Sequence, residues 1–589
     1  MSWCCCLTGS QDDQDYYQPL AMGPTPSSHH LILVRDKGRA AALSRTQDGV
    51  HVVKVRSASS TRTIPFLALL SASSSSSLDH SAPHSSPPHP TVTLSALVPA
   101  TRKNDPNAPT KLWTLKGRVV EVNYPPIDEG GMGEAEVGQE EAKHKALEAW
   151  CKEIEKRAYA SVDRRRRRLH CIVNPAGGKG KAKRVWEEVV RPVFEAADVS
   201  FDVSYTGPPS SPTNAAALAR SHDPAAYDAL VALSGDGIVH ELLNGLATHS
   251  SGKGGDVLRR TPVVHVPCGS GNALATSLMG PEKVLDCRWA ALAALKGNPI
   301  PLDLCSLIQP SSGDGNRLFS FLSQAFGLMA DLDLGTEHLR WMGDARFTYG
   351  YIRGALSRVA YPCTVSVLLP SARSSGLHAP TKSAIAKAHN ASLSPAAAKA
   401  KPDDAAKATS DGALPPLLHG SFSALSSSLP DGPRWKNHLP SQDELERLGE
   451  VTGEGHEWVH FEMEEKGVFF LYGGKVPFIS RDVMMFPAAD PNDGLLDLAI
   501  VEPMGPIEAL TAMDGADRGA LLSNPRVLYL KALAYRVTFP PQKEGGGCLS
   551  IDGEAVPYEG WQVECHRGVG RVMSLEGRWE GRRRVEGFD

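Results

Sequence analysis

The chain has 589 residues, enough for about two to four domains that each bury a core of their own. Its 62 lysines and arginines nearly balance 66 aspartates and glutamates, and the net charge of -4 excludes a global basic field for nucleic acid. The 11 cysteines lack the spacing of a disulfide framework or a zinc site, which favours a reducing, cytoplasmic setting.

Residues 1–29 are predicted to form a disordered, cysteine-containing tail. The tail lacks the basic start and apolar centre of a secretory signal, and Ser2 replaces the glycine that N-myristoylation requires. Cys4, Cys5 and Cys6 are candidates for reversible palmitoylation, and unmodified thiols are the alternative. Because no apolar run approaches the roughly 20 residues that span a bilayer, any membrane association is expected to be peripheral.

Two segments precede the first strongly periodic region. Residues 30–125 contain short β-like runs, such as HLILV and VHVVKV, interrupted by the low-complexity stretch SASSSSSLDHSAPHSSPPHP. This pattern predicts a small β-rich region of the pleckstrin-homology type with a membrane or regulatory role. Residues 126–168 are predicted to be a helical linker that ends in five arginines. The arginines indicate a solvated helix end or, alternatively, a contact with anionic lipid.

Residues 169–300 alternate between strand-like and helix-like segments. The runs LHCIVN, FDVSYT, YDALVALS and PVVHVP are predicted to be strands, each followed by a loop and a helical pattern. Such alternation is typical of βαβ units and predicts an α/β domain with a mostly parallel sheet. Ligands of such sheets bind at the carboxyl ends of the strands.

The rest of the chain predicts a second domain with a long insertion. Residues 371–454 are rich in Ala, Ser, Pro, Lys and Asp and are predicted to be disordered. The flanking segments, 301–370 and 455–589, contain Val-, Leu-, Phe- and Tyr-rich runs with period-two alternation. They predict one antiparallel β-sandwich.

Three glycine-bearing loops each follow a predicted strand of the α/β domain. They are NPAGGKGKA (174–182), SGDG (234–237) and PCGSGNALA (267–275). Successive glycines let backbone N–H groups approach phosphate oxygens, and a helix N-terminus behind each loop adds a favourable dipole. The chain has no P-loop and no dinucleotide fingerprint after the first strand. The loops therefore predict a phosphate site of another geometry.

These loops, together with FGLMADLDLGTEHLRWMGDARFTYG and IDGEAVPY, resemble the motif set of the sphingosine (long-chain sphingoid base) kinases, within the diacylglycerol-kinase-like lipid kinases. The resemblance implies that ATP binds between the α/β domain and a β-sandwich that holds the lipid. It makes Asp236, the third residue of SGDG, the general base that deprotonates the lipid hydroxyl for attack on the γ-phosphoryl group. The flanking glycines leave this carboxylate uncrowded at a sharp turn.

The resemblance also implies a set of nucleotide-binding residues in the three loops and two later segments: Asn174, Pro175, Ala176, Gly177, Gly178, Thr206, Gly237, Glu241, Gly269, Ser270, Gly271, Arg340, Arg346, Asp552, Gly553 and Glu554. Two features depart from the family pattern. Many relatives carry arginine where Ala176 stands, and an insertion follows Thr206. Mg²⁺ is expected to accompany ATP, with Asp236, Asp552 and Glu554 as candidate ligands.

Several of these assignments have a competing interpretation. Guanidinium groups suit a triphosphate, but Arg340 and Arg346 would also form surface ion pairs with Glu337 or Asp344. A sequence such as that of Asp552 and Gly553 is also typical of a plain hairpin turn.

The lipid is expected to contact Ser234, Gly235, Asp236 and Gly237, and to be recognised by Asp333 in MADLDLG. A carboxylate about 4 Å from the ammonium of a sphingoid base contributes roughly 4 kcal/mol at an effective dielectric near 20, before desolvation is subtracted. The lipid tail arrives from a membrane, where it is already out of water. Contacts with the head group should therefore decide selectivity, unless Asp333 is only a helix-capping or turn acid.

Other lipid kinases and a non-enzyme remain as alternatives. Ceramide kinases share a pleckstrin-homology-like region, but ceramide has no free amine and their third loop differs from GSGNALA. Diacylglycerol kinases typically carry GGDG and GTGND where this chain has SGDG and GSGNA. A catalytically inactive lipid-binding scaffold is the alternative from another class, and Asp236 with its three loops argues against it. The expected location is the cytoplasm, with peripheral association to membranes.

Overall fold

A computed structural model describes residues 31–36, 39–45, 49–54, 57–65, 69–76, 90–99, 110–123, 139–160, 162, 167–178, 180–312, 316–335, 345–357, 359–371, 377, 379–394, 412–419, 431–451, 456–512, 514–540 and 547–587. The chain divides into two compact units, residues 1–167 with 187–200, and residues 168–186 with 201–589. Cys4, Cys5 and Cys6, residues 77–89 of the Ser/Pro/His-rich stretch and Arg340 lie outside the described residues, whereas residues 71–76 of that stretch belong to a described strand (Leu69–Ser76).

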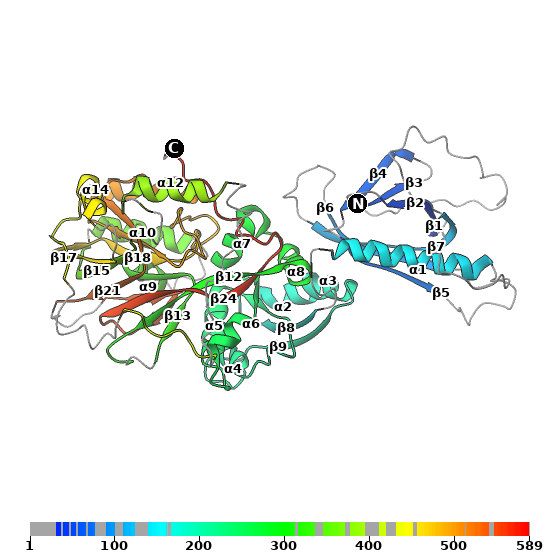
Figure 1. The fold of residues 1–589 in the computed structure, drawn as a ribbon, viewed down its shortest axis with the longest axis horizontal. Coiled ribbons are helices and arrows are strands. Elements are labelled where there is room, and N and C mark those ends of the chain that lie inside the picture. Colours follow the sequence, from blue (N-terminus) through cyan, green and yellow to red (C-terminus); the bar gives the residue numbers. More distant parts are fainter. Residues whose placement is uncertain are drawn as a thin grey trace. The chain divides into compact units, whose positions relative to one another are not determined.

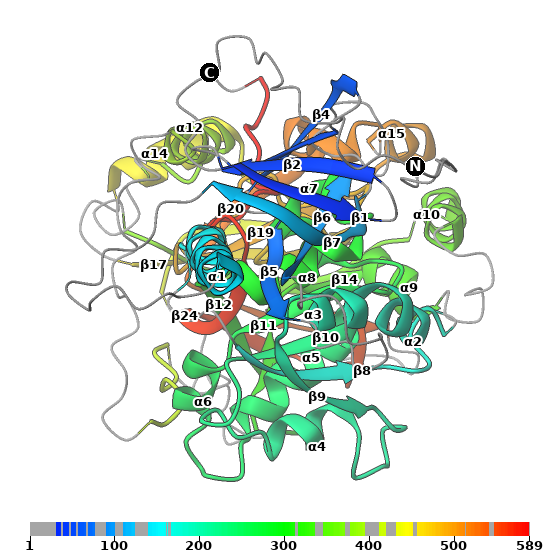
Figure 2. The ribbon, with the colours of Figure 1, turned by 90° about the vertical axis from the view of Figure 1, so that its right-hand side faces the viewer.

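The first unit is built on a seven-stranded antiparallel sheet. Its strands in spatial order are β4 (Ser57–Pro65), β3 (Gly49–Lys54), β2 (Arg39–Arg45), β1 (Leu31–Asp36), β7 (Thr110–Asn123), β6 (Pro90–Pro99) and β5 (Leu69–Ser76). The long helix α1 (Gln139–Ala158) runs along β5 (Figures 1 and 2). The prediction of a small β-rich region is therefore confirmed.

The prediction of a helical linker for 126–168 was only partly right. The apolar stripe of α1, which includes Leu147, Trp150 and Ile154, is fully buried and belongs to the core of this unit. Glu155 accepts a hydrogen bond from the backbone N–H of Ala72 at 3.1 Å. The helix is thus part of the β-rich unit, because its apolar spacing matches the face of the sheet.

The second unit begins with four strands in parallel arrangement. Their order is β11 (Val263–Pro267), β10 (Ala229–Ser234), β8 (Arg168–Val173) and β9 (Ser200–Tyr205). The pairs β10–β11 and β10–β8 are parallel, with Ser234 opposite Pro267 in the first pair. The helices that follow these strands include α2 (Lys181–Val185), α4 (Ala215–Arg220), α5 (Asp236–Ala247), α6 (Gly254–Arg260), α7 (Ala273–Lys283) and α8 (Cys287–Lys296).

The same sheet continues through β24 (Trp561–Ser574), which pairs in parallel with β11, into a mostly antiparallel part. Beyond β24 follow β21 (Ala534–Thr538), β15 (Tyr361–Leu369), β17 (Glu457–Val468) and β16 (Arg434–Lys436), and β12 (Asn298–Ile308) and β13 (Leu318–Ser320) branch from the same path. The α/β and β-sandwich regions therefore share one sheet rather than forming two separate ones.

A second, six-stranded antiparallel sheet completes the sandwich. Its order is β20 (Val527–Ala532), β19 (Leu496–Val501), β18 (Phe470–Gly474), β14 (Ser323–Gly327), β22 (Leu549–Ile551) and β23 (Glu554–Val556). Buried aliphatic and aromatic side chains from both sheets form one core, with α9 (Leu328–Gly335) and α10 (Ala345–Ser357) contributing to it. The predicted fold class, an α/β domain with a β-sandwich, is confirmed.

The prediction that residues 371–454 are disordered is wrong for part of this segment. The described residues include α12 (Lys382–Ser392), the short strand β16 and α14 (Gln442–Val451). Ile385 and Leu445 of the two helices are buried in the sandwich core. The low average hydrophobicity of the whole insertion concealed two short amphipathic helices that need only a few apolar side chains to pack.

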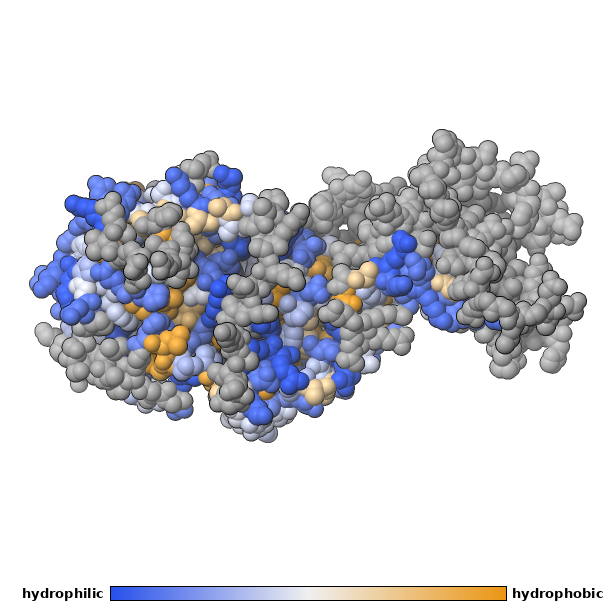
Figure 3. Space-filling view, viewed as in Figure 1, coloured by the Kyte–Doolittle hydropathy of each residue, from blue (hydrophilic) through white to orange (hydrophobic). Residues whose placement is uncertain are grey.

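The described helices include none that is both long enough and apolar enough to cross a bilayer. Figure 3 shows mostly hydrophilic residues on the described surface in this view, with apolar residues gathered in a few patches.

Candidate functional site

The three glycine-bearing loops meet at one edge of the parallel strands, because the strands that precede them are neighbours. The parallel hydrogen-bond pattern continues past the strand ends, from Asn174 N to Leu233 O (3.2 Å) and from Cys268 N to Ser234 O (2.8 Å). Residues that the sequence separates by up to about a hundred positions are thus brought side by side at the carboxyl ends of the strands, where α/β sheets bind ligands.

Two contacts between the loops leave no room for a side chain. A Cβ atom on Gly178, whose φ is 56°, would lie 2.1 Å from the carbonyl oxygen of Cys268. A Cβ atom on Gly269 would lie 2.6 Å from the Cα atom of Gly235. The first and second loops are therefore each packed backbone to backbone against the third, an approach that the missing side chain of glycine permits.

Replacing Gly178 by alanine should force the first and third loops apart, because the added methyl group would clash with backbone atoms. We expect the affinity for ATP to fall about tenfold, or roughly 1.4 kcal/mol, as measured by calorimetric titration. Gly252 provides a matched control, since its φ is 72° and a Cβ atom there would meet nothing within 4 Å. Wild-type affinity in Gly178→Ala, or an equal loss in Gly252→Ala, would show that loop contact does not shape the phosphate site.

Asp236, the third residue of the second loop, is also the first residue of α5. Its Oδ2 accepts a hydrogen bond from Ala273 N at 2.9 Å, and its Oδ1 accepts one from Leu274 N at 3.1 Å. These N–H groups belong to the first turn of α7, where donors lack partners within the helix and the dipole favours a negative charge. The side chain keeps 11% of its surface exposed. The carboxylate is thus held in one orientation at the edge of the loops, not in the core.

A histidine that the sequence analysis missed lies beside this carboxylate. The Nδ1 atom of His265, on β11, is 3.8 Å from Oδ1 of Asp236. Its Nε2 atom lies 3.1 Å from the carbonyl oxygen of Ser234 and donates to it. Burial lowers the pKa of His265 below its ordinary value, and the neighbouring Asp236 carboxylate opposes this shift.

Two further carboxylates lie near the second loop. Oε1 of Glu554 would be 3.0 Å from a Cβ atom on Gly237. Burial raises the pKa of Glu241, and the negative charge of Glu554 raises it further, against hydrogen bonds from the backbone of Ala216 and Ala215. The neighbourhood of the loops therefore combines N–H donors for an anion with carboxylates that favour a cation.

The described residues contain no group of three or more His, Cys, Asp and Glu side chains arranged to hold a metal ion. Of the three candidate Mg²⁺ ligands, Asp236 and the exposed Glu554 are placed at the loops. Both carboxylate oxygens of Asp236 already accept hydrogen bonds from α7, whereas Glu554 projects from an exposed turn. This donor set fits a Mg²⁺ ion that is bound largely by substrate phosphates and by one or two carboxylates.

The side chain of Asp552 does not face a ligand site, which corrects its assignment as a nucleotide or metal contact. Its carboxylate is fully buried and accepts hydrogen bonds from Ser320 Oγ (2.6 Å), from the backbone N–H groups of residues 321–323, and from His240 Nδ1 (2.8 Å). The φ of Asp552 is 52°, so the tight turn after β22 points the carboxylate inward. The exposed part of this turn is formed by Gly553 and Glu554.

Asp236, His240 and Asn244 share one side of α5 at intervals of four residues. Burial opposes a charge on His240, but its hydrogen bond to Asp552 raises the pKa of His240 above its ordinary value. Asn244 forms two hydrogen bonds of 2.8 Å with the backbone of Phe319. Both contacts join α5 to the sandwich strands. The spacing in DGIVHELLN was the sequence signal for this polar face.

Thr206 is buried, and its hydroxyl contacts Asn174 Oδ1 at 3.4 Å instead of projecting outward. Asn174 Oδ1 also accepts from the backbone N–H of Ala176 at 3.1 Å, which shapes the first loop. The Thr206 hydroxyl thus supports Asn174, and its expected contact with the nucleotide stays a prediction. The exposed tips of the loops include Pro175, Ala176 and Ser270.

Asp333 lies on α9 and accepts a hydrogen bond from Ser550 Oγ at 3.2 Å. Asp331, two residues earlier, accepts one from the hydroxyl of Tyr361. Asp333 therefore lies beside β22, the strand that leads into the turn carrying Glu554. Arg346 belongs to α10, and its side chain lies outside what the structure describes.

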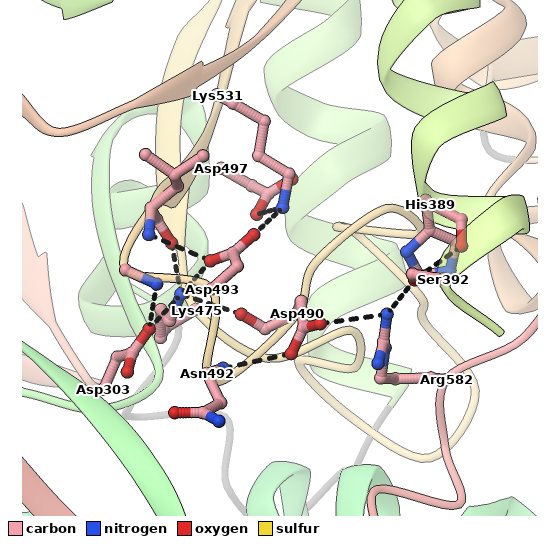
Figure 4. A network of polar contacts seen from close by, with 12 residues as sticks. Asp303, His389, Ser392, Lys475, Asp490, Asn492, Asp493, Asp497, Lys531 and Arg582 are labelled. Atoms are coloured by element: carbon pink, nitrogen blue, oxygen red, sulfur yellow. Dashed lines mark hydrogen bonds and ion pairs between the residues drawn. The ribbon is translucent and has the colours of Figure 1, made fainter. Parts of the chain in front are cut away.

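A buried ion network supports the loop between β18 and β19, which borders the site. The carbonyl oxygen of Ile479 in this loop would lie 3.6 Å from a Cβ atom on Gly271, and Phe478 N donates to Ser277 Oγ of α7 at 3.3 Å. Figure 4 shows the charged side chains at the base of the loop. Sequence analysis missed this network entirely.

Lys475 is the centre of that network. Its ammonium lies 2.8 Å from Oδ2 of Asp303, from Oδ1 of Asp493 and from the carbonyl oxygen of Asp490, and it also donates to the carbonyl oxygen of Leu495 (Figure 4). The second buried ammonium, that of Lys531, contacts Asp493 Oδ2 at 2.8 Å and Asp497 Oδ2 at 2.9 Å.

Comparison with known proteins gives two family matches and several relatives. A diacylglycerol kinase catalytic domain matches residues 168–307, and a YegS C-terminal NAD kinase beta sandwich-like domain matches residues 471–574. The chain is 30% identical over 448 residues to sphingoid long chain base kinase 5 of Saccharomyces cerevisiae, covering 72% of this chain and 62% of that protein. The match thus spans less than two thirds of the length of that yeast protein.

Two further relatives match different lengths of this chain. Sphingoid long chain base kinase 4 of Schizosaccharomyces pombe is 27% identical over 495 residues, which cover 82% of this chain and 92% of that protein. Human sphingosine kinase 1 is 38% identical over 189 residues, which cover 31% of this chain and 47% of that protein.

Proposed function

Because the chain matches a diacylglycerol kinase catalytic domain and is similar to sphingoid long chain base kinases, we propose that it transfers the γ-phosphoryl group of ATP to the primary hydroxyl of a sphingoid base. The acceptor class is sphingosine, dihydrosphingosine or phytosphingosine, and the product is the 1-phosphate. The observation that carries this proposal is the carboxylate of Asp236, held by two backbone N–H groups at the junction of the three loops. The names of the relatives support the choice of sphingoid base.

Asp236 acts as the general base. It accepts the hydroxyl proton of the lipid as the alcohol oxygen forms a bond to the γ-phosphorus and the bond from that phosphorus to the bridging oxygen of ADP breaks. Phosphoryl transfer has a loose transition state, so positioning and charge neutralisation should supply most of the acceleration. Fixing the carboxylate through α7 serves this positioning.

ATP is bound at the three loops, near Asn174 and Gly178 in the first and Gly269 to Gly271 in the third. Arg340 and Arg346 bind its phosphates. Glu554 would hold a Mg²⁺ ion that accompanies ATP, because Asp236 is engaged by α7 and by the lipid hydroxyl. The ion would neutralise phosphate charge. The close backbone packing at Gly178 and Gly269 supports this arrangement.

Asp333 recognises the ammonium of the sphingoid base, the group by which this lipid differs from ceramide and diacylglycerol. Its place on α9, beside the strand that precedes the Gly553–Glu554 turn, supports this role. The enzyme acts in the cytoplasm with peripheral association to membranes, to which palmitoylated Cys4, Cys5 and Cys6 contribute.

A competition between lipids tests the function. The full chain is given sphingosine, dihydrosphingosine, phytosphingosine, ceramide and diacylglycerol in mixed micelles at fixed ATP and Mg²⁺, and products are quantified by mass spectrometry. We expect kcat/KM for at least one sphingoid base to exceed that for ceramide and diacylglycerol by about tenfold or more, or roughly 1.4 kcal/mol. Preferential turnover of ceramide or diacylglycerol would overturn the substrate assignment. Binding without any phosphorylated product would favour the scaffold.

A further inference from the structure

Helix α7, whose first turn holds Asp236, is interrupted near its C-terminal end. The backbone of Gly280 is non-helical, with φ 82° and ψ 157°, and Pro281 follows it. Because proline has no N–H group, the carbonyl oxygen of Ser277 cannot receive the hydrogen bond that residue 281 would donate in a regular helix. Buried backbone carbonyl groups are almost always paired, so another part of the chain has to supply the donor.

Residues 579–585, the brace, supply that donor. Gly581 N donates to Ser277 O at 2.9 Å, and Glu580 N donates to Leu278 O at 3.2 Å. The contact is backbone to backbone, since a Cβ atom on Gly581 would lie 2.7 Å from both the Cα and the O atom of Ser277. The brace therefore completes the hydrogen bonding of α7 one turn beyond the N–H groups that hold the general base.

Side chains of the brace fix it in place. Lys283 Nζ of α7 lies 2.8 Å from Glu580 Oε2. Trp579 is buried in the core that contains the helices of the α/β domain, and Val585 is buried in the core of the sandwich. The brace is thus anchored at its two ends in different hydrophobic cores, with α7 in contact with the residues between them.

The brace also contacts α12, a helix of the insertion. Asn390 uses its whole amide group, since Nδ2 donates to Val585 O at 3.0 Å and Oδ1 accepts from Val585 N at 2.8 Å. His389 Nε2 donates to the carbonyl oxygen of Arg583 at 2.9 Å. The insertion is therefore joined to α7 by way of the brace.

Arg582 joins the brace to the loop between β18 and β19. Its Nη2 atom lies 3.0 Å from Oδ2 of Asp490 and 2.6 Å from Oγ of Ser392 at the end of α12 (Figure 4). Phe478 N of the same loop donates to Ser277 Oγ, so the brace and the loop hold the same turn of α7. Parts of the chain that are far apart in sequence thus converge on the helix that orients the general base.

Resting on the proposed function, we propose that Gly581 is a positioning residue for Asp236, which it holds in place through the brace and α7. The brace fixes α7, and α7 presents Ala273 N and Leu274 N to the two carboxylate oxygens. Such support matters to the rate, because a misplacement of about 1 Å can lower it about 10²-fold. The contact with Asn390 makes the insertion helix part of the same support.

The variant Gly581→Ala tests this role. The added methyl group would clash with Ser277 and push the brace away from α7. We expect kcat to fall about tenfold, while KM for the lipid stays within about twofold, because Asp333 lies on another helix. Gly505→Ala is the matched control, since Gly505 is exposed and a Cβ atom there would meet nothing within 4 Å. Its kcat should stay within about twofold of the wild type.

A double-mutant cycle supplies a readout that a merely structural role would not move. Because Gly581 acts through Asp236, Gly581→Ala should change the residual kcat of Asp236→Asn by less than about twofold, since the base that it positions is already gone. A general defect in folding would instead lower kcat by the same factor in both backgrounds. Equal factors in the two backgrounds would therefore overturn the proposal.

Further outcomes separate the failure of this proposal from the failure of the function. Wild-type kcat in Gly581→Ala, or an equal loss in Gly505→Ala, would overturn the role of the brace, while loss of activity in Asp236→Asn would leave the kinase proposal intact. Full activity in Asp236→Asn would overturn both. Should Gly581→Ala fail to fold, as judged by calorimetric ATP binding, Asn390→Ala carries the same test from the far end of the brace. Its kcat should fall about threefold, and an unchanged kcat would overturn the proposal.

Discussion

Replacing Asp236 by asparagine is expected to lower kcat for the sphingoid base by about 10²- to 10⁴-fold, the range associated with removal of a general base. Asparagine keeps the size of the side chain, but it is not basic. It also offers only one acceptor to the two N–H groups of Ala273 and Leu274, so we expect a loss of stability of roughly 1–3 kcal/mol. Initial rates at saturating ATP and lipid measure the first effect, and thermal unfolding measures the second.

The control for this variant is Asp256→Asn. Asp256 also lies in the first turn of a helix, α6, but its ion pair with Arg260 is on the surface at 3.4 Å, where such pairs contribute about 0–1 kcal/mol. We expect its activity to stay within about twofold of the wild type, because substitutions on the surface away from such a site have small effects. Wild-type kcat in Asp236→Asn, with ATP still bound, would remove this carboxylate from the mechanism.

The sequence predicted those parts of the site whose residues lie close together in the chain. Asp236, Gly178 and Gly269 stand in short loops directly after apolar strands, and strand order alone brings such loops to one edge of a parallel sheet. The glycines of these loops, and the carboxylate between two glycines of SGDG, can each be recognised from a few consecutive residues of the sequence. The same holds for the strands of the sandwich, which alternate with period two.

The parts that could not be predicted depend on partners far apart in the chain. Asp552 was expected to face the nucleotide, yet its carboxylate is held by Ser320 and the backbone of Ser323, more than two hundred residues away in sequence. Lys475 and Asp303 lie within or beside apolar runs that gave no sign of a buried ion pair. Periodicity identifies which residues are buried, but it does not identify which charges compensate one another.

Replacing Lys475 by methionine is expected to lower the free energy of unfolding by about 3–5 kcal/mol, the range for removing one partner of a buried ion pair. Burial opposes the charge, but the carboxylates of Asp303 and Asp493 hold the pKa of Lys475 well above its ordinary value, so the ammonium is charged at neutral pH. Methionine nearly matches the length of the side chain. It leaves both carboxylates and the carbonyl oxygens of Asp490 and Leu495 without this cation.

The unfolding transition is measured in urea by the loss of ATP binding, which reports on the unit that contains the loops. Lys466→Met is the matched control, because its ion pair with Glu502 at 3.2 Å is partly exposed and should contribute about 0–1 kcal/mol. The loop between β18 and β19 also borders Gly271, so Lys475→Met should raise KM for ATP even where the protein is folded, whereas Lys466→Met should not. A change in unfolding free energy of less than about 1 kcal/mol in Lys475→Met, similar to that of an exposed pair, would mean that Lys531 alone neutralises the buried carboxylates.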